Sequence, residues 1–139
     1  MEFTHLWFSF KGRINRAKYW LVTLVNGVIL AVLFLLAVAV NSTALMILVG
    51  LLFVPIIVSS LGITVRRLHD REKSAWWLLL FYLLPGVLQG IGEGIGGNAS
   101  LLLLIISAAL SIWAFVEIGC LRGTAGDNRY GSDPLAGYG

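Results

Sequence analysis

Arginine is the residue type in this sequence best suited to hold an anionic ligand. A guanidinium group carries five N–H donors in a rigid plane, and it can bind a carboxylate or a phosphate through two hydrogen bonds. The candidates for an anion or headgroup site are Arg13, Arg16, Arg66, Arg67 and Arg129. Asp70 and Asp133 are the nearby acids, and they are too few to neutralise five arginines. The pattern therefore allows an internal network of ion pairs, a site for an anion or lipid headgroup, or both.

A second set of side chains is expected to complete an internal network that locks helix ends together. Its members are His69, Asp70, Glu117, Asn128, Tyr130 and Asp133. Glu117 lies near the end of an otherwise apolar stretch, where a charge is costly unless it has a partner. We expect its carboxylate either to snorkel to the membrane surface or to pair with Arg66, Arg67 or Arg122. A role of Glu117 in ion or proton handling stays open.

Catalytic and metal-binding patterns are weak in this chain. His69 and Asp70 are neighbours, so on a helix their side chains point about 100° apart, and neither fits a metal-ligand spacing such as H-E-x-x-H. Cys120 is the single cysteine, which excludes an internal disulfide and a cysteine-based zinc site. We therefore predict no catalytic centre, no metal and no cofactor. A membrane enzyme acting on lipid would have to use His69, Asp70 and Glu117.

The composition is that of a membrane protein. Hydrophobic residues make up 58% of the chain and charged residues 12%, with a mean hydropathy of +0.89. Soluble domains contain roughly 45–50% apolar and 25% charged residues. Such a composition excludes a disordered chain, a nucleic-acid-binding arm and an ordinary soluble domain.

Charge is excluded from two long stretches. Residues 19–65 contain no charged side chain, and residues 74–121 contain only Glu93 and Glu117. A helix needs about 20 apolar residues to cross the hydrocarbon core of a bilayer, so each stretch is long enough for two spans.

Polar breaks at residues 41–43 and 92–100 divide the two stretches. The sequence thus predicts an all-α integral membrane protein, with residues 1–139 forming a single domain of four transmembrane helices in two hairpins. The predicted spans are about 20–40, 44–65, 74–91 and 101–121. Pro85 removes a backbone hydrogen bond and is expected to kink the third span, and Pro55 is expected to interrupt the second.

Lysine and arginine predict the orientation. All ten basic residues lie in the segments 1–19, 66–73 and 122–139, and the two hairpin tips contain none. Short loops rich in Lys and Arg remain in the cytoplasm. We therefore expect both termini and the middle loop to be cytoplasmic. Gly123, Gly126 and Gly131 and the turn formers around them predict a tail that folds back on this face.

Three motifs carry a resemblance to a known family. They are Phe10-Lys11-Gly12-Arg13-Ile14-Asn15-Arg16 followed by Tyr19-Trp20, then Arg66-Arg67-Leu68-His69-Asp70 followed by Ser74 and Trp76-Trp77, and finally the tail from Arg122 to Pro134. In this order they resemble the DUF805 family of small bacterial inner-membrane proteins. Residues 71–73 depart from that pattern, in which a smaller, often glycine-containing stretch is expected. The resemblance implies a multi-pass protein of the bacterial inner membrane. It does not specify an activity, because the function of the family is unknown.

The function predicted from these features is that of a membrane-embedded binding or scaffold protein. Its basic cytoplasmic face would engage anionic lipid headgroups or a protein partner. The alternative is a subunit of a small oligomeric channel or transporter, in which Gly86 and Gly90, or Ser107 and Ser111, would allow close helix contact within or between subunits. The expected partners are the lipid bilayer, including anionic lipids, and a second copy or another membrane protein. Nucleic acid is not expected.

Overall fold

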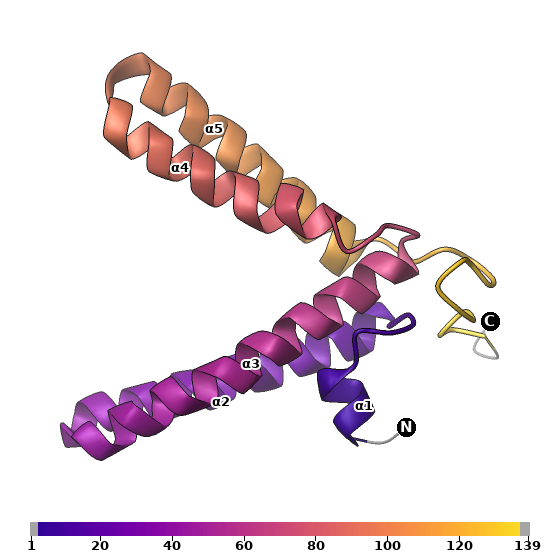
Figure 1. The fold of residues 1–139 in the computed structure, drawn as a ribbon, viewed down its shortest axis with the longest axis horizontal. Coiled ribbons are helices and arrows are strands. Elements are labelled where there is room, and N and C mark those ends of the chain that lie inside the picture. Colours follow the sequence, from indigo (N-terminus) through magenta and orange to yellow (C-terminus); the bar gives the residue numbers. More distant parts are fainter. Residues whose placement is uncertain (1–2, 137–139) are drawn as a thin grey trace.

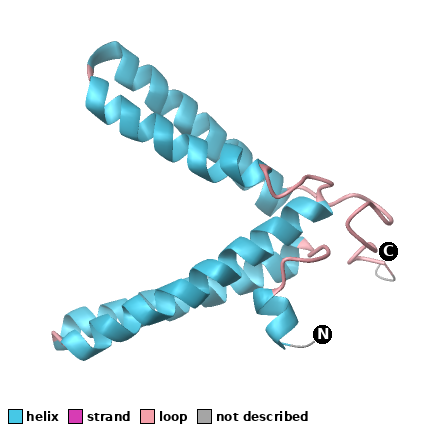
Figure 2. Cartoon of the chain, viewed as in Figure 1, coloured by secondary structure: helices cyan, strands magenta, loops and turns pink. Residues whose placement is uncertain are grey.

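The computed structural model describes residues 3–136, which form helices and connecting loops and no strand (Figure 2). The elements in chain order are α1 (Phe3–Phe8), α2 (Arg16–Val40), α3 (Thr43–Asp70), the π-helical segment η1 (Leu79–Leu83), α4 (Leu84–Ile95), α5 (Gly97–Ala114) and the π-helical segment η2 (Phe115–Cys120). The predicted all-helical architecture is thus confirmed for the described residues.

The long helices form two hairpins that meet at one end of the molecule (Figure 1). One hairpin is α2 with α3, and the other is η1 and α4 with α5 and η2. Segment η2 makes the main contacts between them, with α2 and α3, and beyond this point the hairpins diverge. By length and composition, α2, α3 and Gly97–Cys120 are long enough to cross a membrane, and Leu79–Ile95 is a shorter apolar helix.

The turn of the first hairpin lies at the predicted polar break. Asn41 has a φ of 53°, in the left-handed region that often ends a helix, and its backbone N–H donates to carbonyls at the end of α2. The Ser42 side chain then accepts a hydrogen bond from the backbone N–H of Leu45 and caps α3. At the start of α2, the Asn15 side chain caps the helix in the same way.

The turn of the second hairpin is much tighter than predicted. Helix α4 continues to Ile95 and α5 begins at Gly97, so that Gly96 alone separates them, where residues 92–100 were expected to be a polar turn. Gly96 and Gly97 have φ values of 72° and 70°, which glycine adopts readily. Gly92 lies close to the Ser100 backbone, and this close packing keeps both helices regular up to the turn.

The ends of the second and third spans also differ from prediction. Helix α3 continues to Asp70, so the segment expected to begin a loop at residue 66 is helical for five more residues. It also passes through Pro55 without ending. The third helix starts later, after turns near residue 75, and passes through η1 before Pro85. Because Pro85 has no N–H to donate to the Phe81 carbonyl, a π-helical turn at this point accommodates the missing bond.

The buried core lies where the hairpins meet. Its buried apolar members are Ile14, Tyr19, Val22, Ile63, Leu68, Phe81, Ala114 and Ile118. Farther along the hairpins, large apolar side chains such as Leu35, Leu51 and Leu101 are exposed, as expected for surfaces that face lipid.

Helix α1 and the loop after it pack on α2 and α3 through a close backbone approach and a polar chain. At Gly62, an added Cβ would lie 3.0 Å from the Ser9 carbonyl oxygen. The Trp7 indole N–H donates to Asn26 at 3.1 Å, and the Asn26 amide donates to the Ser59 hydroxyl at 3.1 Å. These bonds satisfy polar groups that would otherwise be buried in apolar surroundings.

We predict that Gly62→Val destabilises the protein, because the added side chain must displace the loop that packs on α3. Overpacking of this kind typically costs about 1–3 kcal/mol. Gly50→Val is the matched control, since it changes the same helix at a position with no neighbour within 4 Å. Thermal unfolding in detergent should show a lower midpoint for Gly62→Val alone. Equal midpoints for the two variants would contradict the close packing at Gly62.

Candidate functional site

The candidate site is the end of the molecule where the hairpins and both terminal segments meet (Figure 1). We call this end the terminal face and define it by residues 9–18, 66–74 and 117–136. It contains most of each of the three motifs noted in the sequence, and all eleven residues predicted to form the anion site or the internal network. Glu117 lies at its inner edge in η2.

A buried carboxylate stands at the centre of the terminal face. Asp70 is 3% exposed and ends α3. The Arg13 guanidinium donates from Nε to Asp70 Oδ1 at 3.0 Å, and the Arg67 guanidinium donates to Asp70 Oδ2. The Asp70 carbonyl oxygen also accepts from the backbone N–H of Thr124 at 2.7 Å. One residue thus connects the N-terminal loop, α3 and the C-terminal tail.

The two arginines use their remaining donors on backbone carbonyls. Arg13 donates to the carbonyl of Gly126 at 2.6 Å and to that of Thr124. Arg67 donates to the carbonyl of Ile118 at 2.7 Å and to that of Leu121. The Arg67 bonds reach the C-terminal end of η2, where helix carbonyls lack partners of their own. The arginines therefore fix both the tail and the second hairpin to α3.

The position of the buried Asp70 carboxylate also requires a glycine at residue 123. Its backbone passes so close to Asp70 that an added Cβ would overlap the carboxylate. The glycine is thus explained by close approach to Asp70, and Gly126 and Gly131 by their φ values of 73° and 139°.

Glu117 has partners other than those expected from the sequence. Its carboxylate pairs with Arg71 Nε at 2.8 Å and with Lys73 Nζ at 3.1 Å. The predicted partners Arg66, Arg67 and Arg122 form no ion pair with it. The prediction was wrong because α3 extends to Asp70, which turns the first two arginines into the helix packing and brings residues 71–73 over η2. These ion pairs join the loop after α3 to the second hairpin.

The loop after α3 also contains a residue with unusual backbone geometry. Glu72 has a φ of 59°, in the left-handed region that glycine occupies without strain. This is the stretch where the sequence departs from the family pattern and where a glycine is often expected.

The tail packs on the terminal face through aromatic and amide groups. The His69 and Tyr130 rings stack with centroids 4.0 Å apart, and His69 Nδ1 lies 3.1 Å from the Gly12 carbonyl oxygen. The Asn128 amide donates to the His69 carbonyl at 3.0 Å. The Arg129 guanidinium lies over the Tyr130 ring. The described part of the tail is thus folded back on the face, as its turn-forming residues predict.

Asp133 organises the end of the tail. Its carboxylate accepts backbone N–H groups from Gly126 and Leu135, each at 2.9 Å. These two hydrogen bonds favour the charged form and lower the pKa of the Asp133 carboxyl below its usual range. Asp133 is therefore ionised at neutral pH and closes the tail into a loop.

The five candidate arginines lie at separate places on the face. Arg13 and Arg67 are buried around Asp70, and Arg66, 1% exposed, donates to the His5 and Leu6 carbonyls beneath α1. Arg66 Nε has no hydrogen-bond partner among the described residues. Arg16 is exposed and donates to the Cys120 carbonyl at 2.7 Å, and Arg129 donates to the Glu72 carbonyl. An anion can therefore approach Arg16 and Arg129, but it would have to displace internal bonds at Arg13 and Arg67.

The sequence does not reveal the role of several residues at or near the site. Arg71 and Lys73 indicate only the orientation, and Gly123 indicates only a turn. Asn26 and Ser59 are polar residues within apolar stretches, and this contrast is the signal that could have identified them.

Comparison with known proteins identifies the family. Residues 7–132 match the family described as "Protein of unknown function (DUF805)". The chain belongs to the DUF805 family. The chain is similar to inner membrane protein YhaI of Escherichia coli strain K12, with 31% identity over 93% of the chain and 88% of the relative. It is 35% identical to uncharacterized protein YiiR over 91% of the chain and 86% of the relative.

A third relative supports the same location. Inner membrane protein YhaH of Escherichia coli strain K12 is 33% identical over 91% of the chain and 87% of the relative. No solved structure matches the chain. Family membership and the apolar helices together identify this DUF805 protein as a multi-pass protein of the bacterial inner membrane.

We predict that Asp70→Asn strongly destabilises the protein, because two buried guanidinium groups lose their counter-charge. Breaking a buried pair from one side costs about 3–5 kcal/mol. Asp127→Asn makes the same chemical change at an exposed position and is the control. Detergent thermal unfolding should show a much lower midpoint for Asp70→Asn, while the amount of membrane-inserted protein stays unchanged. A normal midpoint would show that Asp70 does not hold the terminal face together.

Proposed function

We propose that this protein is a membrane-embedded binding protein that crosses the bilayer four times and engages anionic lipid headgroups through a cytoplasmic terminal face. The orientation is supported by the position of the basic residues, all of which lie on or beside the terminal face. The far ends of the hairpins, at Asn41 and Gly96, have none nearby. By the positive-inside rule, this distribution supports a cytoplasmic location for both termini.

The division of charge on the terminal face carries the proposal. Four basic residues are used in ion pairs with the two buried acids Asp70 and Glu117. Within residues 3–136, the other six form no ion pair: Lys11, Arg16, Lys18, Arg66, Arg122 and Arg129. Glu72, Asp127 and Asp133 are the remaining acids on this face, so positive charge is in excess. Such an excess attracts anionic headgroups, by about 1 kcal/mol for each basic residue near the surface.

Apolar side chains beside these cations support a location at the membrane surface. Phe3, Phe8 and Phe10 are exposed on or next to α1, and Lys11 follows them. A short segment with aromatic and basic residues is suited to the headgroup region, with the rings directed into the acyl boundary.

Binding has more support than a channel. The polar residues Asn26 and Ser59 lie within the hairpin, where a pore-lining role could be imagined, but they hydrogen-bond to each other and to Trp7. Their polar groups are therefore engaged inside the subunit.

The first test concerns orientation. Single cysteines at Thr43 and Asn98 should react with a membrane-impermeant thiol reagent from the periplasmic side of intact cells, and one at Ser132 should not. Each is introduced with Cys120 replaced by Ser, so that labelling reports the new position alone. Labelling of the Ser132 position in intact cells would refute the cytoplasmic terminal face.

The second test concerns headgroup attraction. Replacing Lys11, Lys18 and Arg122 together by Gln should lower the enrichment of phosphatidylglycerol over phosphatidylcholine around the purified protein at least about fivefold, since each removed charge is worth about 1 kcal/mol. Mass spectrometry of the co-purified lipids measures it. Arg122→Lys is the control, because it preserves charge and should preserve enrichment. Unchanged enrichment in the triple variant would contradict the proposed function.

A further inference from the structure

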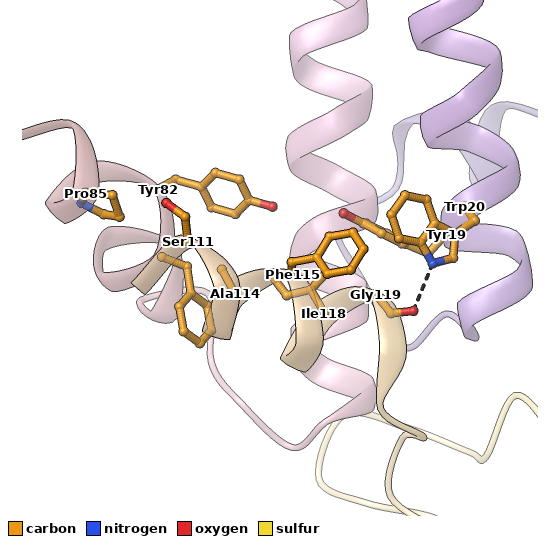
Figure 3. Close-up of a pocket in the computed structure, with 10 residues that line it drawn as sticks. Tyr19, Trp20, Tyr82, Pro85, Ser111, Ala114, Phe115, Ile118 and Gly119 are labelled. Carbon is orange, nitrogen blue, oxygen red and sulfur yellow. Dashed lines mark hydrogen bonds between the residues drawn. The ribbon is translucent and has the colours of Figure 1, made fainter. Parts of the chain in front are cut away.

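A cavity of about 320 Å³ lies where the two hairpins begin to diverge. Its walls come from α2, from η1 and α4, and from α5 and η2, so both hairpins are needed to form it (Figure 3). The residues that give the cavity its chemistry are Tyr19, Trp20, Tyr82, Ser111 and Phe115. The volume lies at the lower end of the roughly 300–1,000 Å³ typical of small-molecule sites. It is too small for a transmembrane helix, which is about 10–12 Å wide with its side chains.

The lining combines hydroxyl groups with apolar surface. The side chains of Tyr19 and Tyr82 point toward one another across the space between the hairpins, and Ser111 lies beside Tyr82 (Figure 3). A second cavity of about 300 Å³ shares these two tyrosines and adds the hydroxyls of Thr23, Ser60 and Thr64. A layer of hydroxyl donors with apolar surface beside it suits the ester groups and first acyl carbons of a phospholipid.

A cation is placed at the rim of the cavity nearest the terminal face. The Trp20 indole N–H donates to the Gly119 carbonyl at 2.8 Å, and Arg16 donates to the next carbonyl, that of Cys120, at 2.7 Å. Arg16 and Trp20 are one turn apart on α2, a rise of about 6 Å. The exposed Arg16 guanidinium has five N–H donors and uses one of them in this bond, so that the others can bind a phosphate.

The cavity wall is held in place before any ligand binds. Gly119 brings η2 against the Trp20 ring so closely that an added Cβ would lie 2.6 Å from the ring edge. Trp20 also packs edge-on against Phe115, with ring centroids 5.7 Å apart. A preorganised wall reduces the ordering cost of binding.

We infer that this cavity is the seat of one anionic glycerophospholipid, with its phosphate at Arg16, its ester groups at Tyr19 and Tyr82, and an acyl chain leaving between the hairpins. The inference rests on the proposed function and names the ligand class and the position of one tightly held molecule. A bilayer lipid can enter from the side, because the hairpins diverge toward the acyl region (Figure 1).

The test compares variants of the full-length protein loaded with phosphatidylglycerol or with phosphatidylcholine of the same acyl chains. Ser111→Phe fills the cavity without changing charge, and Arg16→Gln removes the rim cation. Ala109→Phe adds the same ring to an exposed position of α5 outside the cavity and is the control. Native mass spectrometry should show one retained phosphatidylglycerol in the wild type and in Ala109→Phe, and at least a fivefold loss in the other two.

A second measurement keeps the test decisive if a variant folds poorly. Phosphatidylglycerol with a photoreactive group in its acyl chain should crosslink to the wild-type protein at Tyr82 or Phe115. The inference would be refuted if Ser111→Phe retained as much phosphatidylglycerol as the wild type, or if the wild type retained both lipids equally. Crosslinks found only outside the cavity would also refute it, as would a second copy of the chain crosslinked at the cavity. The triple variant at Lys11, Lys18 and Arg122 separates the two proposals. If only the triple variant loses phosphatidylglycerol enrichment, the lipid site in the cavity is refuted, while the proposed attraction of headgroups to the terminal face is supported.

Discussion

The structure depends on the burial of Asp70 between Arg13 and Arg67. Moving a carboxylate and two guanidinium groups out of water is expensive, and the cost is offset only when every remaining donor and acceptor is satisfied. Arg13 therefore requires the carbonyls of the tail, and Arg67 requires those at the end of η2. These requirements fix the tail, the second hairpin and the N-terminal loop relative to α3. The helices above the terminal face can remain plain apolar spans because their ends are positioned here.

The sequence predicts the helices of this protein better than their ends. Long charge-free stretches specify apolar helices, and Asn41 and Ser42 mark a turn with capping chemistry that can be read locally. The end of α3 could not be predicted in this way, because a charged residue in a sequence is normally expected to be exposed to water. Asp70 and Arg67 are instead inside the protein, where they pair with each other and with partners 50 or more residues away. The same reason explains why the partners of Glu117 were predicted wrongly.

The sequence predicts which residue types form the candidate site, but it does not predict which of these residues bond to one another. Arginines and acids in three motifs indicate a charged face, yet the sequence cannot say which arginines serve the fold and which remain available. The structure makes this division by distance: Arg13 and Arg67 surround Asp70, and Arg16 stands at an exposed rim. Gly123 illustrates the limit well. Its type indicates a special backbone position, but close approach to a carboxylate from another segment is a tertiary fact.

Buried and exposed arginines both bond to η2. Arg67 holds this segment from one side through the Ile118 carbonyl, and Arg16 and Trp20 hold it from the other through the next carbonyls along the chain. These carbonyls lie in the π-helical segment η2, and Gly119 lets the Trp20 ring of α2 approach them closely. The position of η2 consequently sets both the angle between the hairpins and the width of the cavity between them. The charged end of this apolar protein thus determines how its two hairpins meet, because the hydrogen bonds that join them lie there.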